Sequence, residues 1–122
     1  MRYMVFVKMA EDVGPAPQAL FEVMGREMAE AFASGMMRDA GGLSGTNDRT
    51  EVRLRGGALS VTDGPFAEGR EVIGGYSIIE VGSHEEAVAS ARRVMEIHQE
   101  YWPGWEGSAE VRRIWDAEEA GA

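Results

Sequence analysis

The segment from Val72 to Val81 constrains the fold of this chain most, because it is apolar at nearly every position. A strand of this kind is usually buried on both faces, so we expect it to lie in the centre of a sheet. Helices can cover one face of that sheet. The other face also needs a cover, since an open apolar face of this size would associate in water. The segment therefore predicts a layered α+β domain that forms a symmetric homodimer through its sheet.

Two amphipathic segments supply the predicted helical layer. Between Gln18 and Ala33, apolar residues recur every three or four positions and form one stripe, which comprises Leu20, Phe21, Met24, Met28, Ala31 and Phe32. A second helix is expected from His84, where Ser83 and Glu86 form a capping box, to the stop at Pro103-Gly104. Its apolar side includes His98, Tyr101 and Trp102. We expect both helices on one face of the sheet.

Alternating apolar and polar residues predict the remaining strands. They are expected at Arg2 to Met9, in a hairpin from Thr50 to Thr62 that turns at Gly56-Gly57, and at Ala109 to Trp115. We interpret Met36 to Leu43 as a connection with a turn at Asp39, Gly41 and Gly42. The resulting order is that of a ferredoxin-like split βαβ fold, with an antiparallel sheet and an additional hairpin. One domain is expected over residues 1–116, followed by an acidic tail over residues 117–122.

The composition excludes several classes of function. The chain has no cysteine, which removes disulfides and thiolate chemistry, and its net charge of −9 argues against nucleic-acid binding. No apolar run approaches the length of a transmembrane helix, and no signal peptide is recognised, so we expect a cytoplasmic protein with no membrane partner. The two histidines are far apart and no cofactor or calcium motif occurs. We therefore expect neither a metal nor a cofactor.

Residues 61–76 carry a family resemblance. The block begins Val61-Thr62-Asp63-Gly64-Pro65-Phe66-Ala67-Glu68 and continues, after Gly69, with Arg70-Glu71-Val72-Ile73-Gly74-Gly75-Tyr76. It resembles the signature of DGPF-domain proteins, a branch of the YCII-related family. A glycine-rich turn precedes the block, and a serine-capped helix and a closing strand follow it, as in that family. The resemblance covers nearly the whole chain.

What the resemblance implies is a ferredoxin-like fold and a dimeric α+β barrel. It implies little about activity, because the first helix lacks the histidine that YCII-like members carry near an aspartate. The signature commonly has threonine-lysine where this chain has Gly69-Arg70. Genes of the family are often associated with those of extracytoplasmic-function sigma factors, which makes sigma-factor regulation an expected context.

The candidate site residues are Asp63, Glu68, Arg70, His98 and Arg112. In one hypothesis, Asp63 is a general base or ligand contact, and Arg70 or Arg112 holds an acidic group of a small molecule. In the structural alternative, which we favour, Asp63 accepts backbone N–H groups of its own turn and Arg70 pairs with a neighbouring glutamate. His98 lies on an apolar stripe, which favours a core or cleft position.

Two functions of different classes follow from these residues. The first is a dimeric module that binds a small molecule or a protein partner. The second is a cofactor-free enzyme that acts on a small acidic or aromatic substrate, with Asp63 as the general base. An aromatic patch of Tyr101, Trp102 and Trp105 could line the mouth of a cleft or seal the core.

Overall fold

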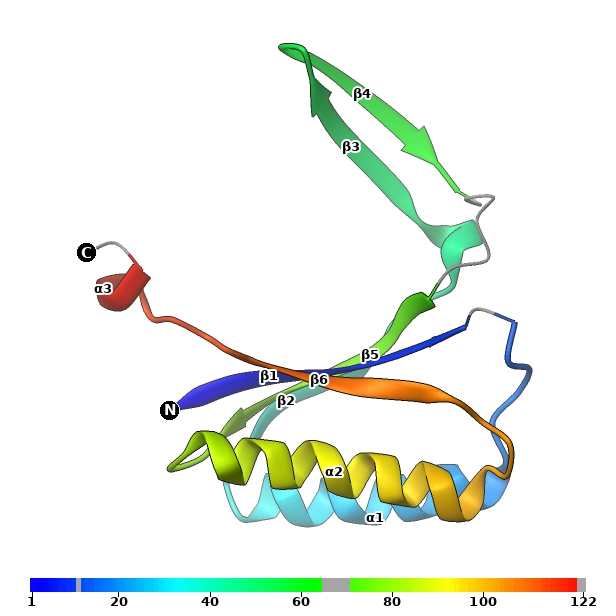
Figure 1. Cartoon of the computed structure of the whole chain (residues 1–122), viewed down its shortest axis with the longest axis vertical. Coiled ribbons are helices and arrows are strands. Elements are labelled where there is room, and N and C mark those ends of the chain that lie inside the picture. Colours follow the sequence, from blue (N-terminus) through cyan, green and yellow to red (C-terminus); the bar gives the residue numbers. More distant parts are fainter. Residues whose placement is uncertain (11, 65–70, 121–122) are drawn as a thin grey trace.

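The chain folds into two layers, with a hairpin that stands apart from both (Figure 1). The computed structural model describes residues 1–10, 12–64 and 71–120. A sheet forms one layer, and two helices pack side by side beneath it as the other. The hairpin rises on the side of the sheet that the helices leave open.

Four antiparallel strands form the sheet in the order β2-β5-β1-β6. The inner strands are β1 (Arg2–Ala10) and β5 (Glu71–Glu80), and the edge strands are β2 (Met37–Gly42) and β6 (Gly107–Arg113). Apart from the hairpin, this is the strand order of a ferredoxin-like fold, so the predicted fold class is confirmed. The expected central position of the apolar strand is confirmed too, because β5 pairs with a neighbour on each side.

The interpretation of Met36 to Leu43 as a turn is wrong, because most of this stretch forms the edge strand β2. Its glycines suggested a turn, but one of them lies directly against an aromatic ring. A Cβ atom on Gly41 would lie 3.0 Å from Cε1 of Tyr76, its partner across the two strands. Glycine in a strand often marks such a close approach. Asp39 faces the same ring and accepts a hydrogen bond from its hydroxyl.

The two predicted helices are confirmed as α1 (Gln18–Ala33) and α2 (His84–Tyr101), and they bury two apolar clusters. In the larger cluster, α2 packs on the central strands through Tyr3, Val5, Ile79, Val81, Ala87 and Ala91. In the smaller one, Leu20 and Val23 of α1 contact Ile97 of α2. The expectation that Phe21 belongs to the buried stripe is wrong, because its side chain is 62% exposed. Phe21 lies at the margin of the stripe, and Val23 is buried instead.

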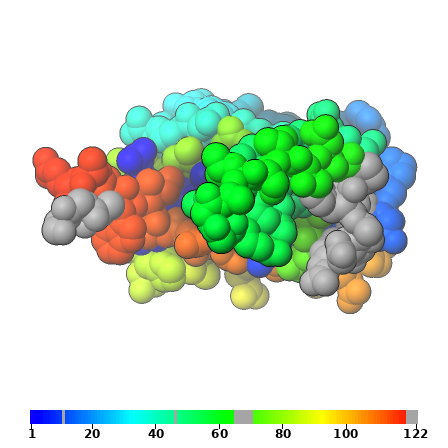
Figure 2. Space-filling view, turned by 90° about the horizontal axis from the view of Figure 1, so that it is seen from above, coloured from blue at the N-terminus to red at the C-terminus, as the bar shows by residue number. Residues whose placement is uncertain are grey.

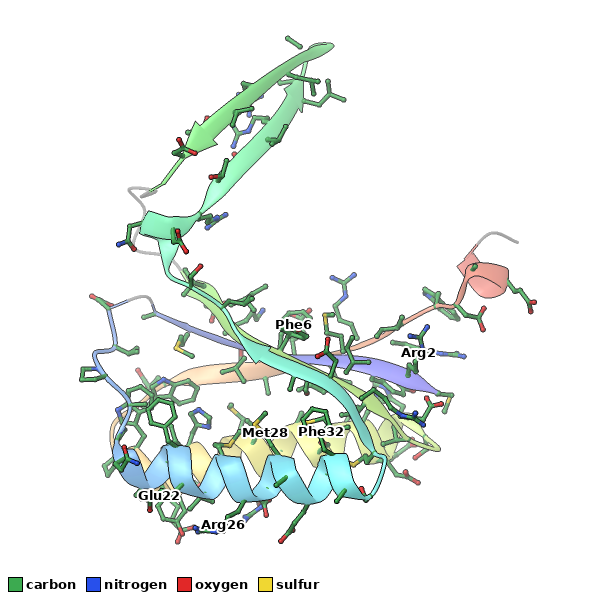
Figure 3. The ribbon with its side chains drawn as sticks, turned by 180° about the vertical axis from the view of Figure 1, so that it is seen from behind. Arg2, Phe6, Glu22, Arg26, Met28 and Phe32 are labelled. Atoms are coloured by element: carbon green, nitrogen blue, oxygen red, sulfur yellow. The ribbon has the colours of Figure 1, made fainter. Side chains whose placement is uncertain are left out.

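The other labelled side chains of α1 point as its periodicity predicts, although Phe32 is also 44% exposed (Figure 3). Met28 and Phe32 extend from the helix toward the sheet, whereas Glu22 and Arg26 point away from it. At the start of α2, Ser83 Oγ accepts a hydrogen bond of 3.2 Å from the backbone N–H of Glu86. The Glu86 carboxylate in turn accepts from the N–H of Gly82, one residue before the serine. The predicted helix cap is therefore present, with its return bond shifted by one residue.

The hairpin is also confirmed, as β3 (Thr50–Arg55) and β4 (Ala58–Asp63), and a short 3-10 helix, η1 (Thr46–Asp48), precedes it. Gly56 and Gly57 have φ angles of 59° and 78°, values that glycine adopts without strain in a two-residue hairpin turn. In the region expected to be a tail, α3 (Ala117–Ala120) forms a single turn of helix. No helix in the described part of the chain has the length and apolar character needed to cross a membrane.

We predict that Ser83→Ala lowers the free energy of unfolding by about 1 kcal/mol, because an N-cap hydrogen bond is lost at the start of α2. Denaturant unfolding followed by circular dichroism measures this change. Ser44→Ala, in an exposed loop outside the helices, is the control and should stay within about 0.5 kcal/mol of the parent protein. Equal stability of the two variants would show that the cap does not stabilise the helix.

Candidate functional site

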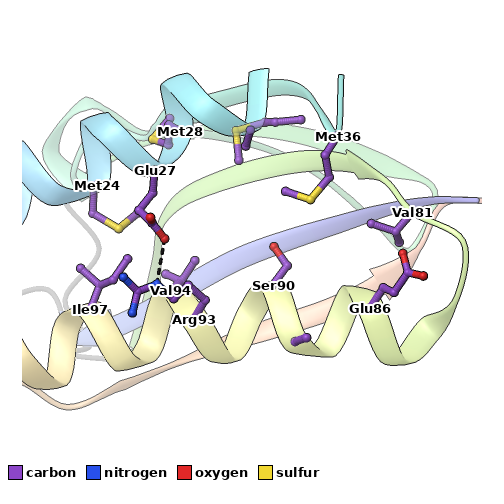
Figure 4. A pocket seen from close by; sticks show the side chains of 13 residues that line it. Met24, Glu27, Met28, Met36, Val81, Glu86, Ser90, Arg93, Val94 and Ile97 are labelled. Carbon is purple, nitrogen blue, oxygen red and sulfur yellow. Dashed lines mark hydrogen bonds and ion pairs between the residues drawn. The ribbon is translucent and has the colours of Figure 1, made fainter. Parts of the chain in front are cut away.

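A pocket of about 440 Å³ lies between α1 and α2 (Figure 4). Its walls are mainly apolar, and four methionines contribute to them: Met24 and Met28 from α1, Met36 just before β2, and Met37 at the start of β2. Val94 and Ile97 of α2 line the opposite wall. Small-molecule sites in proteins usually occupy about 300–1,000 Å³ and are lined mostly by apolar side chains. The pocket therefore has the size and lining of a ligand site.

Small side chains on both helices leave this space open. Ala31 projects from α1, and Ala89 and Ser90 project from α2. Where such residues face each other, two helices cannot fill the region between them with their own side chains. The methionines around this space are unbranched and flexible, so they can adapt to the shape of a bound molecule.

An ion pair joins the two helices at the pocket. Arg93 Nε donates a hydrogen bond of 2.8 Å to Glu27 Oε1, and both residues line the pocket (Figure 4). This hydrogen bond, together with the negative charge of Glu27, raises the pKa of the Arg93 guanidinium above its ordinary value. The Arg93 guanidinium therefore keeps its positive charge at neutral pH and lies against the carboxylate of Glu27.

Sequence patterns alone do not single out Glu27 and Arg93 as site residues, although one signal is present. Glu27 follows Met24 by three positions and precedes Ala31 by four, so it lies on the apolar face of α1. A carboxylate on an apolar helix face needs a partner when it is partly buried. That placement could have drawn attention to this region before the structure was known.

Asp63 lies elsewhere, at the end of the hairpin. It is exposed, and its Oδ1 accepts a hydrogen bond of 2.9 Å from the hydroxyl of Thr50, its partner across the hairpin. The same signature block contains Glu68 and Arg70, which lie outside the described residues. The catalytic or ligand-binding roles suggested for these three residues stay predictions.

His98 is buried in the helical layer, with 7% of its surface exposed. Its Nδ1 lies 2.8 Å from the carbonyl oxygen of Val94, and its ring centre is 4.4 Å from that of Trp105. Trp102 lies beside both rings and packs against the smaller core cluster. Within the described part of the chain, the buried Nε1 of Trp105 has no hydrogen-bond partner. The expected core or cleft position of His98 is confirmed, and the aromatic patch closes one end of the core.

Arg112 is exposed on β6, opposite Met4 of β1. Because side chains alternate along a strand, this register places it on the face of the sheet that the helices do not cover. His98, by contrast, lies in the helical layer, and Asp63 lies on the hairpin. The predicted site residues that the structure describes are therefore not brought together within one chain.

The open face of the sheet mixes apolar and charged side chains. Phe6 points from this face toward the hairpin side (Figure 3), and Met4 and Ile78 share the face with it. Lys8 donates a hydrogen bond of 2.9 Å to Glu110 and lies 3.9 Å from Glu71, so it links β1 to both neighbouring strands. The bond with Glu110 is the main reason that the pKa of Lys8 is raised.

The described residues were also compared with the ligand sets that hold metal ions. Over residues 1–10, 12–64 and 71–120, no group of three or more histidine, aspartate or glutamate side chains is placed to hold a metal ion.

The described geometry can be compared with known proteins. The family model of the YCII-related domain matches residues 1–117. The chain belongs to the YCII-related family. A search of the curated proteins found no match. For this YCII-related protein, the resemblance seen in residues 61–76 is therefore confirmed at the level of the family, and assignment to its DGPF branch stays a prediction.

We predict that Tyr76 of this YCII-related protein loses its proton above the ordinary tyrosine pKa of about 10. Its hydroxyl donates a hydrogen bond of 3.1 Å to Asp39 Oδ2, which raises the pKa because the carboxylate stabilises the protonated phenol and repels the phenolate. Because the pKa of Tyr76 is higher in the folded than in the unfolded state, its hydrogen bond contributes to the free energy of unfolding below about pH 10. That contribution is lost as the pH rises through the pKa of the folded protein.

The phenolate absorbance of the parent protein minus that of Tyr76→Phe gives the titration of this side chain. Asp39→Asn should move the midpoint downward, because the carboxylate charge is removed. A midpoint at or below the ordinary value in the parent protein would contradict the hydrogen bond.

Proposed function

We propose that this YCII-related protein is a dimeric module that binds a small, uncharged, largely apolar molecule between α1 and α2. The observation that carries the proposal is the methionine-lined pocket of about 440 Å³. Three charged residues line it: Glu27 and Arg93 pair with each other, and the carboxylate of Glu86 accepts the N–H of Gly82 at the start of α2. An apolar molecule there would remove apolar surface from water, which is the main driving force for binding in such sites.

The ion pair supports an uncharged ligand. An anionic ligand would lie beside the carboxylates of Glu27 and Glu86, and a cationic ligand that paired with Glu27 would have to displace Arg93. A neutral ligand can leave the pair intact, because the guanidinium has five N–H donors and the carboxylate has two acceptor oxygens. Either group can then hydrogen-bond one polar substituent and orient the ligand.

The enzyme alternative has weaker support. A general base must come within hydrogen-bond reach of the proton that it removes. Asp63 accepts the Thr50 hydroxyl on the exposed hairpin and is not among the residues that line the interhelical pocket. Binding without turnover needs only groups that line the pocket. The link to sigma-factor regulation stays a prediction about the context of the protein.

The neutral fluorescent probe N-phenyl-1-naphthylamine tests the binding proposal, because its emission rises when it enters an apolar site. We expect the parent protein to enhance its fluorescence in a saturable manner. Ala31→Leu places three additional carbon atoms at the pocket wall and should raise the Kd by about tenfold or more, which is about 1.4 kcal/mol or more of binding free energy.

Ala29→Leu is the matched control, since it makes the same change on the exposed side of α1. This variant should bind the probe as the parent protein does. Circular dichroism and thermal unfolding establish that both variants are folded. The binding proposal fails if the parent protein gives no saturable signal, or if both leucine variants bind with equal affinity.

A further inference from the structure

The hairpin carries a continuous apolar face that its own chain leaves exposed. The pairing of β3 with β4 sets Val52 opposite Val61 and Leu54 opposite Leu59, so these four side chains share one face. Their exposed fractions lie between 66% and 73%. The opposite face is polar and includes the ion pair between Glu51 and Arg53, with an N–O distance of 2.8 Å.

An isolated hairpin with such a face is a marginal structure. Two strands alone are barely stable in water, and they become stable when a third strand or another layer covers their apolar side. Among the described residues, β3 and β4 pair only with each other. The apolar face therefore calls for a cover from outside the described chain.

The hairpin stands on the open side of the sheet. In Figure 1 it rises on the side opposite the helices, and Figure 2, seen from that side, shows it standing over part of the body. The sheet face on this side contains Met4, Phe6 and Ile78, which are buried or half-buried within one chain. One molecule that approaches from this side can contact both apolar surfaces.

Area favours an interface that uses both surfaces. Strands of 9, 6, 10 and 7 residues, at about 3.3 Å per residue and 4.8 Å between strands, give the sheet face roughly 500 Å². A stable interface buries about 800 Å² per partner. Two hairpin strands of 6 residues add roughly 190 Å² of planar area, which brings the combined surface close to that size.

We propose that the apolar face of the β3–β4 hairpin packs on a second copy of this chain. The two sheets face each other across a two-fold axis, and each hairpin reaches over the partner. In such an interface the same surface is used on both subunits, so each chain both supplies and receives one hairpin. This inference rests on the dimer of the proposed function and specifies which segment holds it together.

Charge also favours a second copy as the occupant. Between residues 49 and 63, three arginines face two carboxylates, which gives the hairpin a net charge of +1 in a chain of −9. The remainder of a second copy is thus strongly acidic. The positive net charge of the hairpin favours approach to such a surface at long range, although Arg53 and Arg55 themselves lie on the face opposite Val52 and Leu54.

Analytical ultracentrifugation over a range of concentrations tests this inference with two variants of β4. Leu59→Asp places a charge on the apolar face, and Ser60→Asp places the same charge on the opposite face one residue away. Leu59 is 73% exposed in the single chain, so aspartate there should disturb the fold of that chain little. Leu59→Ala provides a milder second variant, and circular dichroism verifies that all three are folded.

We expect a parent mass of twice 13.3 kDa. Leu59→Asp should weaken the dimer by about tenfold or more, Leu59→Ala should weaken it less, and Ser60→Asp should leave it within about twofold of the parent. A parent dimer that Leu59→Asp and Ser60→Asp affect equally would overturn the hairpin inference and leave the dimer standing. A parent protein that is monomeric at all concentrations would overturn both the hairpin inference and the proposed dimer. The result of the probe-binding experiment would be unaffected.

Discussion

A sheet has two faces, and the helices of this protein cover only one of them. Tyr3, Val5 and Ile79 are buried beneath α2 and anchor the two layers to each other. The same strands present Phe6 and Ile78 on the other face. That face also carries Lys8, which forms ion pairs with Glu71 and Glu110. That face is too apolar to be a typical solvated surface and too charged to be the interior of a single chain. The dimer is proposed because a second copy would cover this face. The hairpin rises on the same side, and its exposed apolar face needs a cover for the same reason.

The candidate pocket arises in the covered layer. The two helices are joined by Leu20 and Val23 against Ile97 at one end, whereas Ala31 and Ala89 leave space between them farther along. Methionines line that space, and their flexible side chains can adapt its shape. The Glu27–Arg93 pair bridges the helices, and the carboxylate of Glu86 lies at the same pocket by the start of α2. The pocket and the proposed dimer interface thus lie on opposite sides of the sheet, so a ligand and a second chain can bind at the same time.

Local sequence patterns predicted the elements of this fold better than they predicted the site. Both helices, the hairpin turn and the apolar inner strand have strong periodic or capping signals, and all four are confirmed. Strand β2 was missed because glycines at 41 and 42 resemble a turn, and only the ring of Tyr76 across the strands explains Gly41. The pocket was missed because it depends on where two helices separate, which sequence spacing within each helix does not determine.

Site residues posed a similar problem. Asp63, His98 and Arg112 each have a plausible chemistry in the sequence, but they lie on the hairpin, in the helical layer and on the open sheet face. Glu27 carried a usable signal on its own helix, whereas its partner Arg93 could be found only by bringing two helices together. The sequence therefore predicted which residues have suitable chemistry, but not which of them lie close together in the fold.

Hydrogen exchange of the hairpin amides, measured at high and at low protein concentration, tests the central claim that a second copy covers this side of the molecule. An uncovered two-stranded hairpin opens readily and exchanges fast, whereas a covered one is protected. We predict slow exchange across β3 and β4 at high concentration and faster exchange on dilution, with the core strands β1 and β5 less affected. Fast exchange in the hairpin at every concentration would contradict the account.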